Sequence, residues 1–211
     1  MSFISMEVFR AIRFWLMEPP PGKIQYVSPP MPKSIGEVIF KGFVEAVYIL
    51  LGKGYGISGI KLLLVTIDTM AFLKTGQGNS GKDFKAWLTS YVDLDSMGIN
   101  PDELWEHRSG LLHMTHFHSK AVHEGKVRFL IPSFGPSSSF GFGVEAMKLK
   151  VDPEYGNNYA AYSIEGLVRA VVVGINKFIA EVESDPKLKA LVVSNLGEVV
   201  PDLPMAAFRT K

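Results

Sequence analysis

The chain has 211 residues, of which 47% are hydrophobic, enough to bury a core, so a globally disordered protein is excluded. A formal net charge of +1 excludes a broad electrostatic attraction to nucleic acid or to an anionic membrane, but it is compatible with a local basic groove. Because the sequence contains no cysteine, disulfide-linked partners, thiolate metal sites and cysteine nucleophiles are excluded, and we expect a cytoplasmic protein.

The first 33 residues predict an amphipathic N-terminal segment followed by a proline-rich linker. Residues 1–17 are rich in Phe, Ile, Met and Trp, but Arg10 and Arg13 interrupt the apolar run, so the segment fits neither a signal peptide nor a membrane span. We favour a helix docked on the domain over attachment to a membrane surface. Six prolines within residues 18–33 then predict an extended linker, since proline cannot continue a helix.

Two helices are predicted after the linker. The run Ser34-Ile-Gly-Glu37 has the pattern of a capping box and predicts a helix that ends near residue 51, before a glycine-rich turn. Ser58 predicts the cap of a second helix over residues 59–74. That helix is apolar on nearly every side, which is typical of a buried helix.

Asp68 is a carboxylate within this most apolar helix. With Lys61 and the limited length of the helix, it argues against a transmembrane segment, which we do not expect. A buried carboxylate is costly unless it is paired. We favour a structural pair or a helix cap over orientation of an arginine or a histidine, although the obvious cationic partners lie on the predicted fourth helix.

Residues 76–83, Gly-Gln-Gly-Asn-Ser-Gly-Lys-Asp, match Gly-x4-Gly-Lys and also contain a glycine spacing found in dinucleotide-binding loops. A phosphate-binding loop needs a preceding strand and a hydroxyl after the lysine. Here the preceding segment predicts a helix, and Asp83 takes the position of the hydroxyl. We therefore expect a loop between two helices and no cofactor.

A third helix is predicted from five apolar side chains at helical spacing: Phe84, Trp87, Leu88, Tyr91 and Val92. A fourth helix should begin at Asn100 as N-cap, with Pro101 in its first turn and Glu103 among its early carboxylates. This fourth helix carries most of the histidines.

All five histidines lie in the stretch from His107 to His123. His113 and His116 stand at i, i+3, and together with His118 or a carboxylate they are weak candidates for a zinc site. The glutamate that a hydrolytic zinc motif places between paired histidines is absent. We favour surface or loop histidines over a metal site.

Arg108 and His113 form the candidate catalytic pair. An imidazole can act as general acid or base, and a guanidinium can neutralise a scissile phosphate, so the pair suits metal-independent RNA cleavage. At a spacing of i, i+5 the two side chains diverge by about 140° on an ideal α-helix, so the pair requires the arginine to swing toward the imidazole.

The sequence pattern changes after the histidines. Residues 126–131 and 144–151 predict two short strands and hence a small hairpin. Residues 163–184 predict a long helix with a serine cap, and a shorter helix follows near 186–195. The last residues, 197–211, are expected to form a tail.

Together the elements predict a mainly α protein, with an up-and-down helical bundle over residues 34–196 and a small β-hairpin inserted before the last long helix. Residues 103–113, Glu-Leu-Trp-Glu-His-Arg-Ser-Gly-Leu-Leu-His, resemble the signature of the HEPN superfamily, helical bundle domains with Arg-x4-6-His near the start of a late helix. The Ile67–Ala71 segment is similar to a second recurring feature there, and the resemblance covers roughly residues 35–184.

The resemblance implies a HEPN-like bundle, frequently a homodimer in which two signatures face a shared groove. Many members are metal-independent endoribonucleases of toxin–antitoxin or antiviral defence systems, and others have lost activity. The resemblance assigns Arg108 and His113 as the catalytic pair, and we expect Asp68 and Ser109 to be supporting residues. Ser109 stands where active members often carry a larger polar residue.

Two other functions stay open. One is a non-catalytic helical binding or assembly protein in which the pair fixes the bundle, and the other is a metal-binding protein that uses His113, His116 and a further ligand. Accessible Arg108 and His113 side chains that converge in a cleft would favour the ribonuclease. Buried side chains tied to Asp68 would favour the binding protein.

Overall fold

The computed structural model describes four stretches of the chain: residues 34–78, 80–114, 119–133 and 158–200. All four belong to one compact unit, Pro32–Lys211. The predicted N-terminal segment and linker, the predicted strand 144–151, and residues 201–211 of the predicted tail lie outside the described residues. Residues 197–199, predicted as the start of the tail, are helical instead.

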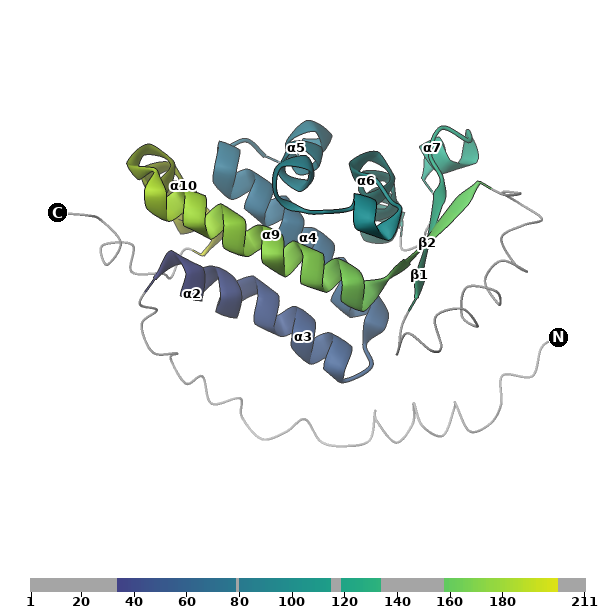
Figure 1. The fold of residues 1–211 in the computed structure, drawn as a ribbon, viewed down its shortest axis with the longest axis horizontal. Coiled ribbons are helices and arrows are strands. Elements are labelled where there is room, and N and C mark those ends of the chain that lie inside the picture. Colours follow the sequence, from purple (N-terminus) through teal and green to yellow (C-terminus); the bar gives the residue numbers. More distant parts are fainter. Residues whose placement is uncertain (1–33, 79, 115–118, 134–157, 201–211) are drawn as a thin grey trace. The chain divides into compact units, whose positions relative to one another are not determined.

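The protein is mainly α-helical, as predicted (Figure 1). In chain order the helices are α2 (Ile35–Ile39), α3 (Glu45–Gly52), α4 (Gly56–Thr75), α5 (Gly81–Tyr91), α6 (Pro101–Ser109), α7 (Lys120–His123), α9 (Ile164–Ser184) and α10 (Pro186–Val199). Two π-helical turns, η1 (Phe40–Val44) and η3 (Gly110–Met114), follow α2 and α6 directly, and a 3-10 turn, η2 (Asp95–Met97), precedes α6. The strands are β1 (Phe129–Ser133) and β2 (Tyr159–Ser163).

The first predicted helix is confirmed as a helical run, but the π turn η1 divides it into α2 and α3, and the start of the second predicted helix is corrected. The Ser34 hydroxyl oxygen accepts the N–H of Glu37 at 3.1 Å, which caps α2. Helix α4 begins at Gly56, so the prediction that Ser58 caps it is wrong. Gly54, with φ of +79°, reverses the chain so soon after α3 that α4 starts before Ser58 is reached.

Helix α4 is the central element of the bundle. It packs against α3, α5, α9 and α10, and Ile60, Leu64, Ile67 and Leu73 are completely buried. By length and composition alone α4 could cross a membrane, and 56% of its apolar window is buried inside the protein. Packing against helices on several sides accounts for a composition that is apolar nearly all round.

The two described strands form a parallel pair, in which Phe129 aligns with Tyr159 and Ser133 with Ser163. The predicted strand at 126–131 overlaps β1, and its predicted hairpin partner at 144–151 lies outside the described residues. The sequence does not predict a strand at 159–163. Alanines at two of its five positions give β2 a weak strand propensity, so pairing with the apolar β1 decides its conformation.

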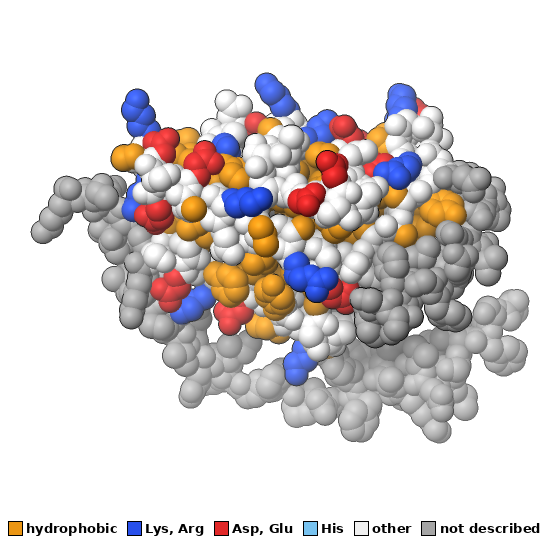
Figure 2. All heavy atoms as spheres, viewed as in Figure 1, with side chains coloured by type: hydrophobic (Ala, Val, Ile, Leu, Met, Phe, Trp, Pro, Cys, Tyr) orange, Lys and Arg blue, Asp and Glu red, His pale blue; other side chains and the backbone are white. Residues whose placement is uncertain are grey.

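The face shown in Figure 2 mixes charges of both signs, and apolar side chains gather along the boundary between α9 and the α2–α3 segment. Phe40 is 44% exposed and Val173 is 52% exposed. This face carries no single-sign field of the kind that attracts nucleic acid over long distances. An RNA site on this face would therefore depend on a few local groups.

Candidate functional site

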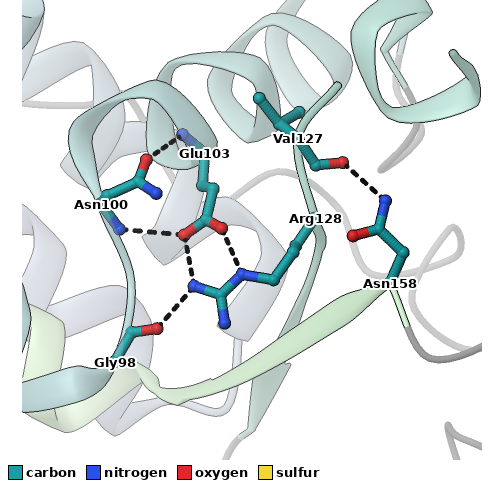
Figure 3. A network of polar contacts seen from close by, with 6 residues as sticks. All are labelled: Gly98, Asn100, Glu103, Val127, Arg128 and Asn158. Atoms are coloured by element: carbon teal, nitrogen blue, oxygen red, sulfur yellow. Dashed lines mark hydrogen bonds and ion pairs between the residues drawn. The ribbon is translucent and has the colours of Figure 1, made fainter. Parts of the chain in front are cut away.

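Helix α6 starts from a rigid N-terminus. The Asn100 side-chain oxygen accepts the N–H of Glu103 at 3.0 Å, and the Glu103 carboxylate accepts the N–H of Asn100 at 2.9 Å, a complete capping box. Figure 3 shows that Arg128, from the segment leading into β1, also binds Glu103 through two nitrogens and donates to the Gly98 carbonyl at 2.8 Å. The carboxylate raises the pKa of Arg128. This network therefore connects the start of α6 to the segment that leads into β1.

A polar pocket of about 310 Å³ borders this network. Its lining contains three carboxylates, from Asp102, Glu103 and Glu106, against the two cations Lys126 and Arg128. Because the Glu103–Arg128 pair neutralises itself, the remaining charge of the lining is negative. The pocket is therefore unsuited to a phosphate backbone.

The other end of α6, which carries Arg108, passes into the π-helical turn η3, which carries His113. A π turn closes its hydrogen bonds between residues i and i+5, so residues five apart lie above one another along the axis. On an ideal α-helix Arg108 and His113 would diverge, but the π turn brings them to the same side. The predicted swing of the arginine is thus replaced by a change in helix geometry.

Arg108 and His113 are in direct contact. Nη1 of Arg108 lies 2.8 Å from Nε2 of His113. Arg108 is 4% exposed, whereas His113 is exposed at the surface. Because a guanidinium can donate but not accept, Nε2 of the imidazole must be the acceptor, and the proton of the neutral ring lies on Nδ1. The structure therefore presents one imidazole to solvent, backed by a buried cation.

Asp68 of α4 holds the guanidinium from the other side. Its Oδ2 accepts a hydrogen bond from Nε of Arg108 at 2.9 Å, and Nη2 of Arg108 lies 2.8 Å from the same oxygen as an ion pair. The side chain of Asp68 is 13% exposed and that of Arg108 is 5% exposed. The same contact therefore fits both predictions for Asp68: a structural pair, which we favour from the sequence, and orientation of an arginine, which is the alternative.

The carboxylate of Asp68 is incompletely satisfied. Both bonds from Arg108 go to Oδ2, and the buried Oδ1 has no hydrogen-bond partner within the described residues. Burial raises the pKa of Asp68 above its ordinary value, and the hydrogen bonds and charge of Arg108 oppose that effect. Buried groups left in this condition concentrate at functional sites.

Two neighbours on α6 complete the surroundings of Arg108. Its guanidinium carbon lies 4.9 Å from the centre of the Trp105 ring, within the range of a cation–π contact. Ser109 donates its hydroxyl to the Trp105 carbonyl at 3.0 Å, a bond within its own helix. Sequence reasoning assigned no role to Trp105, although its spacing of i, i+3 from Arg108 is the signal that could have found it.

His107 lies apart from this site, in the core. It is 2% exposed, and its Nε2 lies 3.0 Å from the Tyr162 hydroxyl. Burial lowers the pKa of His107 from 6.5 to about 3, so the ring is neutral. The prediction of surface or loop histidines is wrong for His107. Its spacing from Leu104 and Leu111, i, i+3 and i, i+4, places it on the buried face of the helix.

The structure also bears on the two alternative sites considered from the sequence. The segment preceding the glycine-rich motif is helix α4, and the Ser80 hydroxyl oxygen caps α5, so the expected loop between helices is confirmed. Among the residues that the structure describes, no three ligand side chains cluster as a metal site. His116 and His118 lie outside those residues.

Comparison of the chain with family models, curated proteins and solved structures finds no match.

Proposed function

We propose that this chain is a HEPN-like, metal-independent endoribonuclease in which His113 and Arg108 are the catalytic residues and Asp68 positions the arginine. The observation that carries the proposal is the 2.8 Å contact between Nη1 of Arg108 and the exposed imidazole of His113. A purely structural arginine–carboxylate pair does not require an exposed imidazole, nor a π turn that aligns it.

The arrangement suits transfer of a phosphoryl group within RNA. When a substrate phosphate accepts a hydrogen bond from Nη1 of Arg108, that nitrogen no longer donates to Nε2 of His113. Nε2 can then take the proton of the neighbouring 2′-hydroxyl. The 2′-oxygen attacks phosphorus, the bond to the 5′-oxygen breaks, and the imidazolium returns the proton to that departing oxygen. Arg108 stabilises the charge that develops on the phosphate, and no metal ion takes part.

Several features support this division of roles. Asp68 withdraws two guanidinium nitrogens from solvent, so Nη1 is left to face His113. The resemblance of residues 103–113 to the HEPN signature selects RNA as substrate, and it leads us to propose a homodimer with a shared groove, of the defence or toxin–antitoxin type. A homodimer is tested by light scattering after gel filtration.

A second candidate function has its own observation. Arg108 is almost completely buried and tied to Asp68, which is the arrangement expected if the pair merely fixes the bundle of a non-catalytic binding or assembly protein. The same experiment separates the two functions, because a binding protein would cleave no RNA.

The deciding experiment is cleavage of fluorescently labelled RNAs of mixed sequence in excess EDTA. We expect the wild-type protein to generate fragments with 2′,3′-cyclic phosphate ends, detected by mass spectrometry. His113→Ala should lower the rate by about 10²- to 10⁴-fold, the range for loss of a general acid–base residue. Arg108→Lys should also lose most activity, because a lysine cannot keep the bonds to both Asp68 and His113.

The matched control is His123→Ala, which removes an exposed histidine from α7 and should leave the cleavage rate unchanged. Cleavage that survives in His113→Ala would show that the activity comes from a contaminant or from another site. A wild-type protein that cleaves none of the RNAs would favour the binding function.

A further inference from the structure

The guanidinium of Arg108 is incompletely held by its carboxylate. Nε and Nη2 both bind the same oxygen of Asp68, whereas a bidentate pair would engage two oxygens and lie in one plane. A contact through one oxygen constrains the tilt of the guanidinium plane less than a bidentate pair does. Nη1 itself contacts the exposed ring of His113, so a group packed against the face of the guanidinium adds to the constraint on its direction.

The indole of Trp105 occupies the position that supplies this constraint. The guanidinium carbon lies 4.9 Å from the centre of the ring, and the two residues are neighbours at i, i+3 on α6. The ring is held in turn by Phe84 of α5, with 5.4 Å between the ring centres and 58° between the ring planes. Because Phe84 holds the indole of Trp105 in place, the face of the indole limits the tilt of the Arg108 guanidinium plane.

Gly81 sets the position of the indole. It is the first residue of α5, and a Cβ built on it would lie 2.8 Å from Cε2 of Trp105 and 3.1 Å from Nε1. Any side chain at this position must displace the ring. The glycine-rich run that resembles a phosphate loop thus has a packing role, because it brings backbone against the tryptophan beneath Arg108.

We infer that Trp105 is a positioning residue for Arg108, and that Gly81 is a glycine because the indole must lie close to the start of α5. The carboxylate holds the guanidinium, the indole limits its tilt, and together they direct Nη1 at His113. The catalytic consequence of this inference rests on the proposed ribonuclease function, but the positioning itself does not.

The positioning is tested by the NMR signal of the Arg108 Nε–H group, assigned by its disappearance in Arg108→Lys. In Trp105→Leu we expect this signal to move, because the ring current is lost, and its exchange with water to become faster. On RNA, kcat should fall about tenfold with KM within about twofold, since one stabilising contact of Arg108 is lost and ground-state binding is not. Trp105→Phe keeps an aromatic face and should recover part of both effects.

Gly81→Ala and Gly78→Ala form a matched pair that leaves Trp105 in place. Alanine favours a helix over glycine, so Gly81→Ala should not weaken α5 itself. A Cβ on Gly78 meets nothing within 4 Å, so Gly78→Ala is the control. We expect Gly81→Ala to shift the Arg108 signal and to lower kcat by about three- to tenfold, with its melting temperature close to that of Gly78→Ala.

The readouts separate the inference from the function on which it rests. An Arg108 signal that stays unchanged in both Trp105→Leu and Gly81→Ala overturns the inference, whatever the activity. A signal that changes in a protein that cleaves no RNA supports the positioning and overturns only the proposed function. Equal effects of Gly81→Ala and Gly78→Ala would show that the loop, and not the indole, is responsible, and this also overturns the inference.

Discussion

Helix α6 has an arginine–carboxylate contact at each end, and the two differ in how completely they are satisfied. At its N-terminus both Glu103 oxygens accept hydrogen bonds, and the arginine partner also binds a backbone carbonyl (Figure 3). At its C-terminal end, one oxygen of Asp68 takes both bonds from Arg108 and the other has none within the described residues.

Under the proposed function, the difference separates a structural network from a functional one. A complete set of hydrogen bonds offsets the free energy needed to remove charges from water. The Glu103 network is complete in this sense, and it connects α6 to the segment that leads into β1. The Asp68–Arg108 pair lacks part of these hydrogen bonds, and its arginine contacts an exposed histidine. A protein keeps such an arrangement where activity, and not stability, depends on it.

The largest expected effect on stability comes from breaking the Asp68–Arg108 pair. Asp68→Ala should lower the free energy of unfolding by about 3 kcal/mol, because Arg108 is left buried without its carboxylate. The combined variant Asp68→Leu with Arg108→Met should recover this loss, since a poorly satisfied ion pair can be replaced by apolar side chains at little or no cost. Urea unfolding measures both. A combined variant as unstable as Asp68→Ala would mark the pair as structural.

Breaking the other network should cost less and should spare the site. Arg128→Met removes a partner that is 40% exposed, and the Asn100 N–H still binds Glu103, so we expect a loss of about 2 kcal/mol. RNA cleavage per folded molecule and the NMR signal of Arg108 should not change. A drop in cleavage at equal folding would contradict the separation of the two networks.

His107, between the two networks, should make stability depend on pH. Its pKa is about 3 in the folded protein against 6.5 as the ordinary value, so below pH 6.5 the unfolded chain binds a proton that the folded protein does not. The free energy of unfolding should therefore fall as the pH falls from 6.5 toward 3, by about 1.4 kcal/mol per pH unit. Between pH 6.5 and 5.5 protonation of the unfolded histidine is still incomplete, so His107→Gln should remove about 1 kcal/mol of the change in urea unfolding over this interval. Equal slopes for the variant and the wild type would contradict the assignment.

The smallest effect is expected at the cap of α6. Asn100→Ala leaves the N–H of Glu103 without its side-chain acceptor and should cost about 1 kcal/mol in urea unfolding. Because the Glu103–Arg128 bonds remain, cleavage per folded molecule should be unaffected. A larger loss, accompanied by lower activity, would show that the orientation of α6 depends on its cap.

Most of the features that could be predicted from the sequence depend on interactions between residues close together in the chain. Caps at Ser34, Asn100 and Ser163 act through hydrogen bonds within a few residues, so the starts of three helices could be predicted from short motifs. The stripe of apolar side chains on α5 likewise specifies its buried face. The candidate pair, Arg108 and His113, could also be named from residue types and spacing.

Tertiary structure decided the features that depend on residues far apart in the chain or on departures from ideal geometry. The parallel pairing of β1 with β2 joins segments 30 residues apart, as the Phe129–Tyr159 register shows, and a weakly β-forming strand depends on that pairing. The π turn that aligns Arg108 with His113 has no local motif. Asp68 is 40 residues from the arginine it holds, and only packing of α4 against its neighbours brings their charges together.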